Sequence, residues 1–323
     1  MSTAFCTLFR VPYQVDASMK STSRLKHSSH QAHHPAPIPP PPPPDDIFPS
    51  SYLEQAFSTN FHPCIKLTAQ DEVAIACKKM FRNQLHDSLC LVACYKKIDA
   101  VIQNGPTCGL VALQMATQLF HPNRVPAIDE ILTTAQNEGY TIQGEMFSAS
   151  DMSRLARKLL HCETSVLNDG LASRHAIVQH ILRGDPILVP YDADFNFEPC
   201  CKRGHKAHWA VVAGVIIAIP KAAVTDLRTY ELNSGLTNLF HATEKSDKEA
   251  LASLCQQGTL YILAKQGKSN WLGLWLYDNL QLSNSNLIEM DPNRVAEGSK
   301  YHLPKGGVVE GLCNQIVLLK KPQ

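Results

Sequence analysis

The chain has 323 residues, of which 44% are apolar, and this is enough material for a hydrophobic core. Its 30 basic and 29 acidic side chains leave a formal net charge of +1, so the composition gives no overall attraction to nucleic acid or to an anionic membrane. We find no secretory leader and no apolar run near the roughly 20 residues that a membrane span needs. The eleven cysteines are therefore expected to be mostly reduced thiols in a cytoplasmic protein, with no nucleic acid or membrane as partner.

Residues 1–50 differ in composition from the rest and predict a disordered tail rich in Ser, His and Pro. Six consecutive prolines stand near its end: Pro39, Pro40, Pro41, Pro42, Pro43 and Pro44. Proline lacks the N–H group and fixes φ, so the tract is expected to be an extended polyproline II segment. It is either a stiff linker or a ligand for the aromatic-lined groove of a partner, and a pure proline run exceeds what spacing alone requires.

From residue 51 onward the composition is that of a globular domain, expected to cover 51–323. Apolar spacing predicts helices at 69–97, 110–120, 126–136, 150–161 and 174–183. Apolar runs predict strands at 185–192, 208–219, 259–265, 271–278 and 314–320. The polar segment 221–257 lacks periodicity and is interpreted as an insertion between strands. Because the predicted helices precede most of the predicted strands along the chain, we expect an α+β domain with a segregated antiparallel sheet.

The segment Gln103–Gly109 leads into the apolar helix predicted at 110–120. Gly105 and Pro106 are helix-entry signals, so Cys108 is expected in the first turn, where the helix dipole and free backbone N–H groups stabilise a thiolate. The N–H of Cys108 would then face a developing oxyanion, with the side-chain amide of Gln103 as a second donor. The alternative is that Cys108 is an ordinary buried cysteine.

His208 stands directly before the long apolar strand predicted at 208–219. A histidine whose backbone is fixed by a sheet is a rigid general base for a cysteine on a facing helix. Papain-like enzymes have the same order, with the cysteine early and the histidine much later. The neighbouring His205 is interpreted as a structural side chain or a substrate contact.

A third residue should accept the other N–H of the imidazole, and it would come from a strand after the one that carries His208. Gln266 lies just past the strand predicted at 259–265, and Asp278 closes the next one. A carboxylate would hold an imidazolium better, whereas an amide would suffice for orientation. The pattern leaves both candidates open.

Two thiols and two imidazoles lie within nine residues around the proposed base: Cys200, Cys201, His205 and His208. Zinc sites use these ligand types, so a zinc-dependent hydrolase is an alternative. However, the side chains of adjacent cysteines point apart. Basic residues also stand inside the cluster, and their positive charge disfavours the binding of a metal cation. Those basic residues, Lys202, Arg203 and Lys206, could instead hold an acidic peptide.

Several segments together resemble the actin maturation protease family, relatives of the bacteriocin-leader-processing cysteine peptidases. They are IQNGPTCGLVALQMA, GYTIQGEMFSASDMSRLA, DPILVPYDADFNFEPC, GHKAHWAVVAGV, LYILAKQGKS and PKGGVVEGLCNQIVLL, and they span most of residues 98–320. The resemblance implies a papain-like cysteine peptidase fold, with the catalytic cysteine on a central helix packed on an antiparallel sheet that carries the histidine. Cys108 and His208 match the nucleophile and the base of the family.

The resemblance also implies an activity and its partners. The expected reaction removes the N-acetylated first residue, methionine or cysteine, from newly made actin and exposes an acidic N-terminus. No cofactor or metal is needed for such a reaction. The proline tract is expected to bind profilin and so to recruit profilin-bound actin. A non-catalytic scaffold that bridges profilin and actin is the alternative of a different class.

Overall fold

The computed structural model describes residues 67–82, 88–223 and 227–321, all within one compact unit. The tail 1–50 with its proline tract lies outside the described residues. Among the described residues, nine strands form one sheet: β1 (Leu89–Tyr95), β2 (Glu163–Leu167), β3 (Ile187–Asp192), β4 (Ala207–Pro220), β5 (Tyr230–Leu232), β6 (Leu239–Ala242), β7 (Thr259–Gln266), β8 (Gly273–Leu276) and β9 (Ile316–Lys320).

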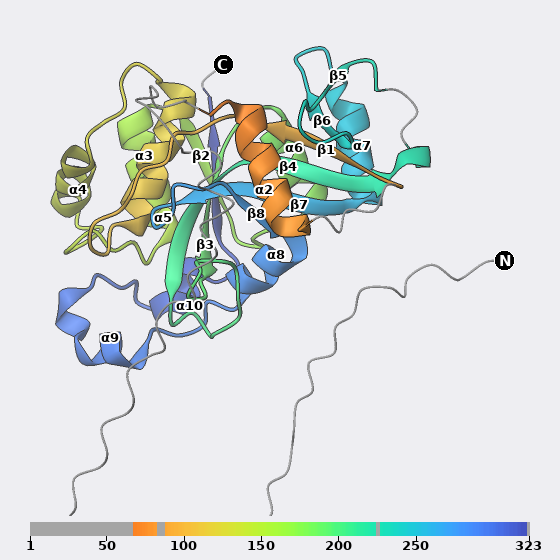
Figure 1. The fold of residues 1–323 in the computed structure, drawn as a ribbon. Coiled ribbons are helices and arrows are strands. Elements are labelled where there is room, and N and C mark those ends of the chain that lie inside the picture. The colour runs from red at the N-terminus through yellow and green to blue at the C-terminus, as the bar shows by residue number, and fades with distance from the viewer. Residues whose placement is uncertain (1–66, 83–87, 224–226, 322–323) are drawn as a thin grey trace, which may run out of the picture. The chain divides into compact units, whose positions relative to one another are not determined.

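The helices of the described part surround this sheet (Figure 1). They are α2 (Ala69–Phe81), α3 (Cys108–Phe120), α4 (Ile128–Asn137), α5 (Ala149–Leu160), α6 (Arg174–Leu182), α7 (Lys248–Gln257), α8 (Tyr277–Ser285), α9 (Pro292–Ala296) and α10 (Gly307–Leu312), with short 3-10 turns at Lys221–Ala223 and Gly298–Lys300. The α+β prediction is confirmed. No helix in the described ranges is both long enough and apolar enough to cross a lipid bilayer.

Strand β4 is the centre of the sheet, because β1, β3 and β7 all pair with it antiparallel. Trp209 and Val211 point toward the core under α3, α4 and α5, whereas Ala210 and Val212 point toward the core under α6 and α7. This alternation is the period of an extended strand. Both faces are covered by helices, which explains why 208–219 is continuously apolar rather than alternating.

Helix α3 is buried on nearly every side, as its run of apolar residues predicts. The first turn approaches the neighbouring loop so closely that a Cβ on Gly109 would stand 2.8 Å from the Cβ of Met146. The helix packs against β4 and β7, and this contact fixes the position of its N-terminal end beside the sheet.

Two predicted elements are wrong in part. The helix predicted at 69–97 ends at Phe81, and Leu89–Tyr95 is strand β1, because a short, continuously apolar run fits a buried strand as well as a helix. The strand predicted at 271–278 is limited to Gly273–Leu276, and α8 begins at Tyr277.

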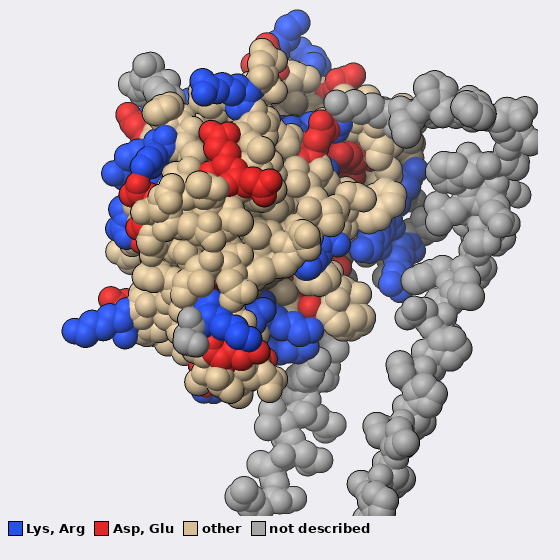
Figure 2. Space-filling view, turned by 90° about the vertical axis from the view of Figure 1, so that its left-hand side faces the viewer, with Lys and Arg blue, Asp and Glu red and all other residues tan. Residues whose placement is uncertain are grey.

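The segment 221–257, expected to be an insertion, contributes elements to the sheet. Its strand β6 pairs parallel with β1, so the sheet is mixed at that edge, and α7 packs against α6 and β4. Figure 2 views the molecule from the side that is on the left in Figure 1. On this face the described charged side chains lie in small groups of both signs around a broad uncharged area, in keeping with the near-zero net charge.

Candidate active site

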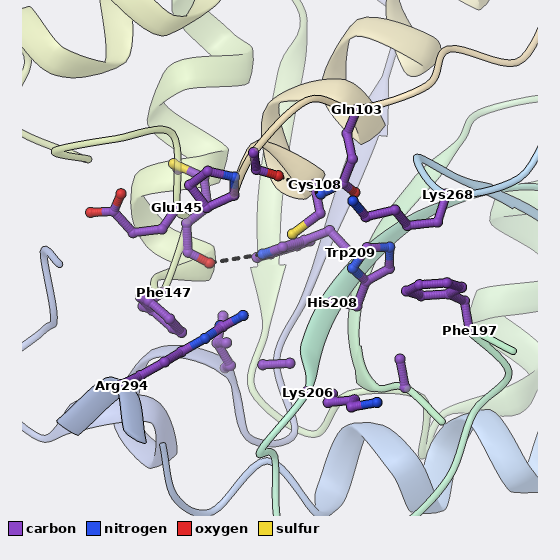
Figure 3. Close-up of a pocket in the computed structure, with 16 residues that line it drawn as sticks. Gln103, Cys108, Glu145, Phe147, Phe197, Lys206, His208, Trp209, Lys268 and Arg294 are labelled. Carbon is purple, nitrogen blue, oxygen red and sulfur yellow. Dashed lines mark hydrogen bonds between the residues drawn. The ribbon is translucent and has the colours of Figure 1, made fainter. Parts of the chain in front are cut away.

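A pocket of about 340 Å³ opens where the start of α3 meets the start of β4. Its lining includes four residues singled out in the sequence: Gln103, Cys108, Lys206 and His208. Figure 3 shows them together with side chains from other parts of the chain. The indole N–H of Trp209 donates to the carbonyl of Met146 at 2.8 Å and closes one wall.

Cys108 is the first residue of α3, as its loop predicts. Gly105 has a φ of +67°, a left-handed conformation that a side chain disfavours, and it turns the chain into the helix. The first four N–H groups of a helix have no partner inside it, so the N–H of Cys108 is free to bind an anion in the pocket.

Burial raises the pKa of the Cys108 thiol. The backbone N–H groups of Trp209 and Gly109 and the positive charge of Arg294 oppose this effect, without overcoming it. The N–H groups at the helix start thus favour the thiolate, as the sequence predicts, and burial outweighs them. Because a thiolate is the nucleophilic form of cysteine, a base that takes up the thiol proton would favour reaction at Cys108.

His208 lies at the beginning of β4, opposite Tyr191 of β3. Its Nε2 is 3.2 Å from Oε1 of Gln266, the last residue of β7. The same oxygen accepts the backbone N–H of Lys268 at 2.6 Å, which identifies it as the oxygen end of the amide. Since that oxygen only accepts, Nε2 of His208 carries the proton and Nδ1 is the free base.

Burial also lowers the pKa of His208, to about 4, with the positive charges of Lys268 and Arg294 adding to the effect and the hydrogen bond to Gln266 opposing it. The imidazole is therefore neutral at physiological pH. Cys108 and His208 thus share one pocket, and burial favours the uncharged form of each.

Gln103 lines the pocket although it stands five residues before the cysteine, where papain-like enzymes usually have six. Its backbone N–H donates to the carbonyl of Gly267 at 2.7 Å. Its side-chain Nε2 donates to the carbonyl of Gly105 at 2.8 Å, and its Oε1 is buried without a partner among the described residues. One N–H of the amide is left over to serve as a second anion donor.

Of the two candidates for a third residue, only Gln266 reaches His208. Asp278 is exposed in the first turn of α8 and does not line the pocket, because the strand expected to end there has already passed into a helix. The alternative with Asp278 is therefore wrong for this geometry.

The fold separates the three basic residues Lys202, Arg203 and Lys206. Lys206 lines the pocket, whereas Lys202 and Arg203 do not. The guanidinium of Arg203 instead pairs with Glu289 at 2.6 and 2.9 Å and lowers the pKa of that carboxyl to about 2, together with the hydrogen bond from His205. Lys202 and Arg203 therefore lie outside the lining of this pocket, where only Lys206 of the three could meet a substrate.

Two further cations, which the sequence patterns do not predict, line the pocket. Lys268 follows β7 and Arg294 belongs to α9. Lys268 stands two residues after Gln266, so its neighbourhood was a usable signal, but nothing near Arg294 in the sequence points to Cys108. The pocket also contains Glu145, whose carboxylate accepts backbone N–H groups from Ile142, Gln143 and His302 and is thereby held against the wall.

The loop 200–206 is organised by a carboxylate rather than by a metal. Asp192 is fully buried and accepts backbone N–H groups from Lys202, Gly204 and Lys206. His205 turns to Glu289, with Nε2 and Oε1 2.8 Å apart, while His208 turns to Gln266. Across the described part of the chain, no group of three His, Cys, Asp or Glu side chains is arranged to hold a metal. The zinc alternative built on Cys200 and Cys201 has no support.

A half-buried cysteine at the start of a central helix, a neutral histidine on the adjacent strand and an amide that fixes its tautomer are the parts of a cysteine peptidase site. The comparisons with known proteins agree. Residues 98–216 match the family model "Actin maturation protease-like, C-terminal domain". That range contains both Cys108 and His208.

The chain is 42% identical over 246 residues to a Bos taurus protein named actin maturation protease, covering 75% of this chain and 70% of the relative. A Homo sapiens protein of the same name is 41% identical, with 75% and 69% covered. The chain therefore belongs to the actin maturation protease family, and it is a protease. A crystal structure described as a C39-like peptidase from Bacillus anthracis covers 71% of this chain and 99% of its own at 11% identity and a TM-score of 0.37, a likeness from which we draw nothing.

Proposed function

We propose that this chain is a cysteine aminopeptidase that removes the N-acetylated methionine or cysteine from newly made actin. The observation that carries the proposal is the pairing, in one pocket, of Cys108 at the start of α3 with His208, whose tautomer is fixed by Gln266. The substrate comes from the relatives, which are named actin maturation protease. Mass spectrometry of actin N-termini after incubation with the protein is the direct test.

In the proposed mechanism, Nδ1 of His208 takes the thiol proton as the sulfur of Cys108 attacks the carbonyl carbon of the acetylated residue. The negative oxygen that forms is stabilised by the N–H of Cys108 and by the side-chain amide of Gln103. The carbon–nitrogen bond then breaks, and His208 returns the proton to the departing α-amine. Water, deprotonated by the same imidazole, hydrolyses the thioester and releases the N-acetyl amino acid.

The charge of the pocket fits an acidic peptide on the leaving side. Lys206, Lys268 and Arg294 line it, and no ion pair involving them is found among the described residues. The single carboxylate of the lining, Glu145, is already bonded to backbone N–H groups. A substrate carboxylate that enters the pocket would therefore meet unpaired positive charge, which is the charge complementarity expected for an acidic actin N-terminus.

Reversing two of these charges, in the double variant Lys268→Glu and Arg294→Glu, is expected to lower kcat/KM for an acetylated peptide with acidic residues after the scissile bond. Like charges across an interface are strongly unfavourable, so we expect a loss of about 100-fold. Peptides with neutral residues in the same places should lose much less. Lys202→Glu, outside the pocket, is the matched control, and an equal loss for acidic and neutral peptides would contradict this role.

We further propose that the tract Pro39–Pro44 binds profilin, and that the enzyme acts in the cytoplasm. The tract is a long polyproline ligand by composition, and the cysteines in the described ranges are all free, as in a reducing compartment. Deleting residues 1–50 is expected to slow the processing of profilin-bound actin by about tenfold or more, since tethering raises the effective concentration. The processing of a short acetylated peptide should be unchanged, and equal effects on both substrates would refute recruitment.

A further inference from the structure

Phe197, in the loop between β3 and β4, has a left-handed backbone conformation with a φ of +62°. This region costs free energy for any residue with a side chain, and for a bulky aromatic residue it is a marked outlier. Such strain persists only where the surroundings enforce it, and it is concentrated at functional sites. Phe197 lines the pocket that contains Cys108 and His208.

The surrounding loop enforces this conformation through its own hydrogen bonds. The carboxylate of Asp194 accepts the backbone N–H groups of Asn196 at 2.8 Å and Glu198 at 2.9 Å. The N–H of Phe197 donates to the carbonyl of Asp194 at 3.3 Å, and its carbonyl accepts the Tyr191 hydroxyl at 2.8 Å. Phe197 is thus tied on both sides, and its ring is directed into the pocket rather than into solvent (Figure 3).

The ring of Phe197 lies against the imidazole of His208, with centroids 5.5 Å apart and planes inclined at 42°. The ring of Tyr191 meets the same imidazole edge-on, with centroids 5.8 Å apart and an angle of 84°. Gln266 holds Nε2 from a third direction. By contrast, Phe195, two residues earlier in the same loop, is 74% exposed and contributes nothing to the pocket.

We propose that Phe197 is a positioning residue for the reaction: its strained backbone presses the ring onto His208, fixes the plane of the imidazole and keeps water from it. This inference rests on the proposed role of His208 as the base. With the plane fixed, Nε2 stays on Gln266 and Nδ1 stays free to act as the base. The strain is then the cost of an orientation that an unstrained loop would not provide.

The electrostatics of the imidazole agree with this role. Its pKa of about 4 is caused mainly by burial, and the ring of Phe197 is part of what buries it. The titratable and charged groups around it come from every neighbouring element: Cys108 of α3, Tyr191 of β3, Lys206 before β4, Lys268 after β7, Arg294 of α9 and Glu145 of the opposite wall. Removing the ring of Phe197 leaves these charges in place. A change in the pKa of His208 would therefore report the loss of shielding from water.

The test is the variant Phe197→Gly, which removes the ring and the backbone strain together. We expect kcat to fall by about 10- to 100-fold, while Tm stays close to that of the wild type because glycine accepts the left-handed conformation. The acid limb of the pH–rate profile should move upward from about 4 toward the ordinary histidine value of 6.5. Phe197→Tyr keeps the ring and should restore both properties, and Phe195→Ala should behave as the wild type.

The same shift can be measured without turnover, by following the ring protons of His208 by NMR as pH is changed in Cys108→Ala and in Cys108→Ala with Phe197→Gly. This comparison needs no catalysis, so it can be interpreted even if the proposed function is wrong. The proposed function and the positioning role of Phe197 can therefore be tested separately. If the glycine variant kept the wild-type pKa of His208, the positioning role would be overturned. Loss of activity in step with loss of Tm, without any change in the pH profile, would also overturn it, since a purely structural residue behaves in that way.

Discussion

Replacing Cys108 by alanine is expected to abolish removal of the acetylated first residue from actin, with a loss in kcat on the order of 10⁴- to 10⁶-fold. In the proposed mechanism the sulfur forms the covalent bond to the substrate, and without it the remaining donors around the pocket would stabilise only a slow attack by water. Mass spectrometry of the actin N-terminus with matched amounts of wild type and variant gives the measurement. The fold should survive, because alanine fits the start of α3 and the half-buried thiol forms no disulfide.

Cys201→Ala is the matched control for this experiment. Cys201 is an exposed, free cysteine outside the pocket, in the segment whose two thiols and two imidazoles suggest a zinc site in the sequence. The variant should process actin as the wild type does. Full activity of Cys108→Ala would exclude Cys108 as nucleophile, whereas loss of activity in Cys201→Ala would revive a role for the Cys200–Cys201 pair.

Replacing His208 by glutamine is the second change with a large expected effect, a loss in kcat of about 10⁴-fold at neutral pH. Burial raises the pKa of the Cys108 thiol, so without the imidazole the proposed mechanism lacks the group that takes up the thiol proton. Gln266→Leu should lose less, because the base remains and only its orientation and tautomer are freed. A His208→Gln protein that keeps the activity of the wild type would show that another group is the base.

The same variant should change how stability depends on pH. The folded protein lowers the pKa of His208 to about 4 from the usual 6.5, so between these values the unfolded chain binds a proton that the folded chain does not. The free energy of unfolding of the wild type should therefore fall as pH falls through this window, by up to about 3 kcal/mol from this group. His208→Gln should lack that part of the acid sensitivity. Urea titrations of both proteins between pH 7 and 4 would measure it, and parallel curves would contradict the assignment.

Some features of the site follow from short segments of sequence. The entry loop Gln103–Gly109 predicted that Cys108 begins a buried helix, because glycine and proline punctuate the chain locally and the apolar run after them can only be a core element. The long apolar run after His208 predicted the central strand for the same reason. The prediction of a helix over Leu89–Tyr95 is wrong because this apolar run is too short for its period to distinguish helix from strand.

Other features depend on contacts that no local pattern contains. Gln266 and Asp278 were equal candidates along the chain, and only the pairing of β4 with β7 brings Gln266 to His208 while Asp278 leaves on α8. The same holds for the cations, since Arg294 enters the pocket from 86 residues beyond His208.

The sequence by itself therefore predicted the cysteine and the histidine of the candidate site and the elements that carry them, since helix entry and strand burial depend on neighbouring residues. The tertiary structure alone decided the surroundings of these two residues: which amide contacts the imidazole, which cations line the pocket, and how burial raises the pKa of the thiol and lowers that of the imidazole. Desolvation and charge act through space, so their sources can lie anywhere in the chain, and packing must bring them together before their effect on a pKa exists.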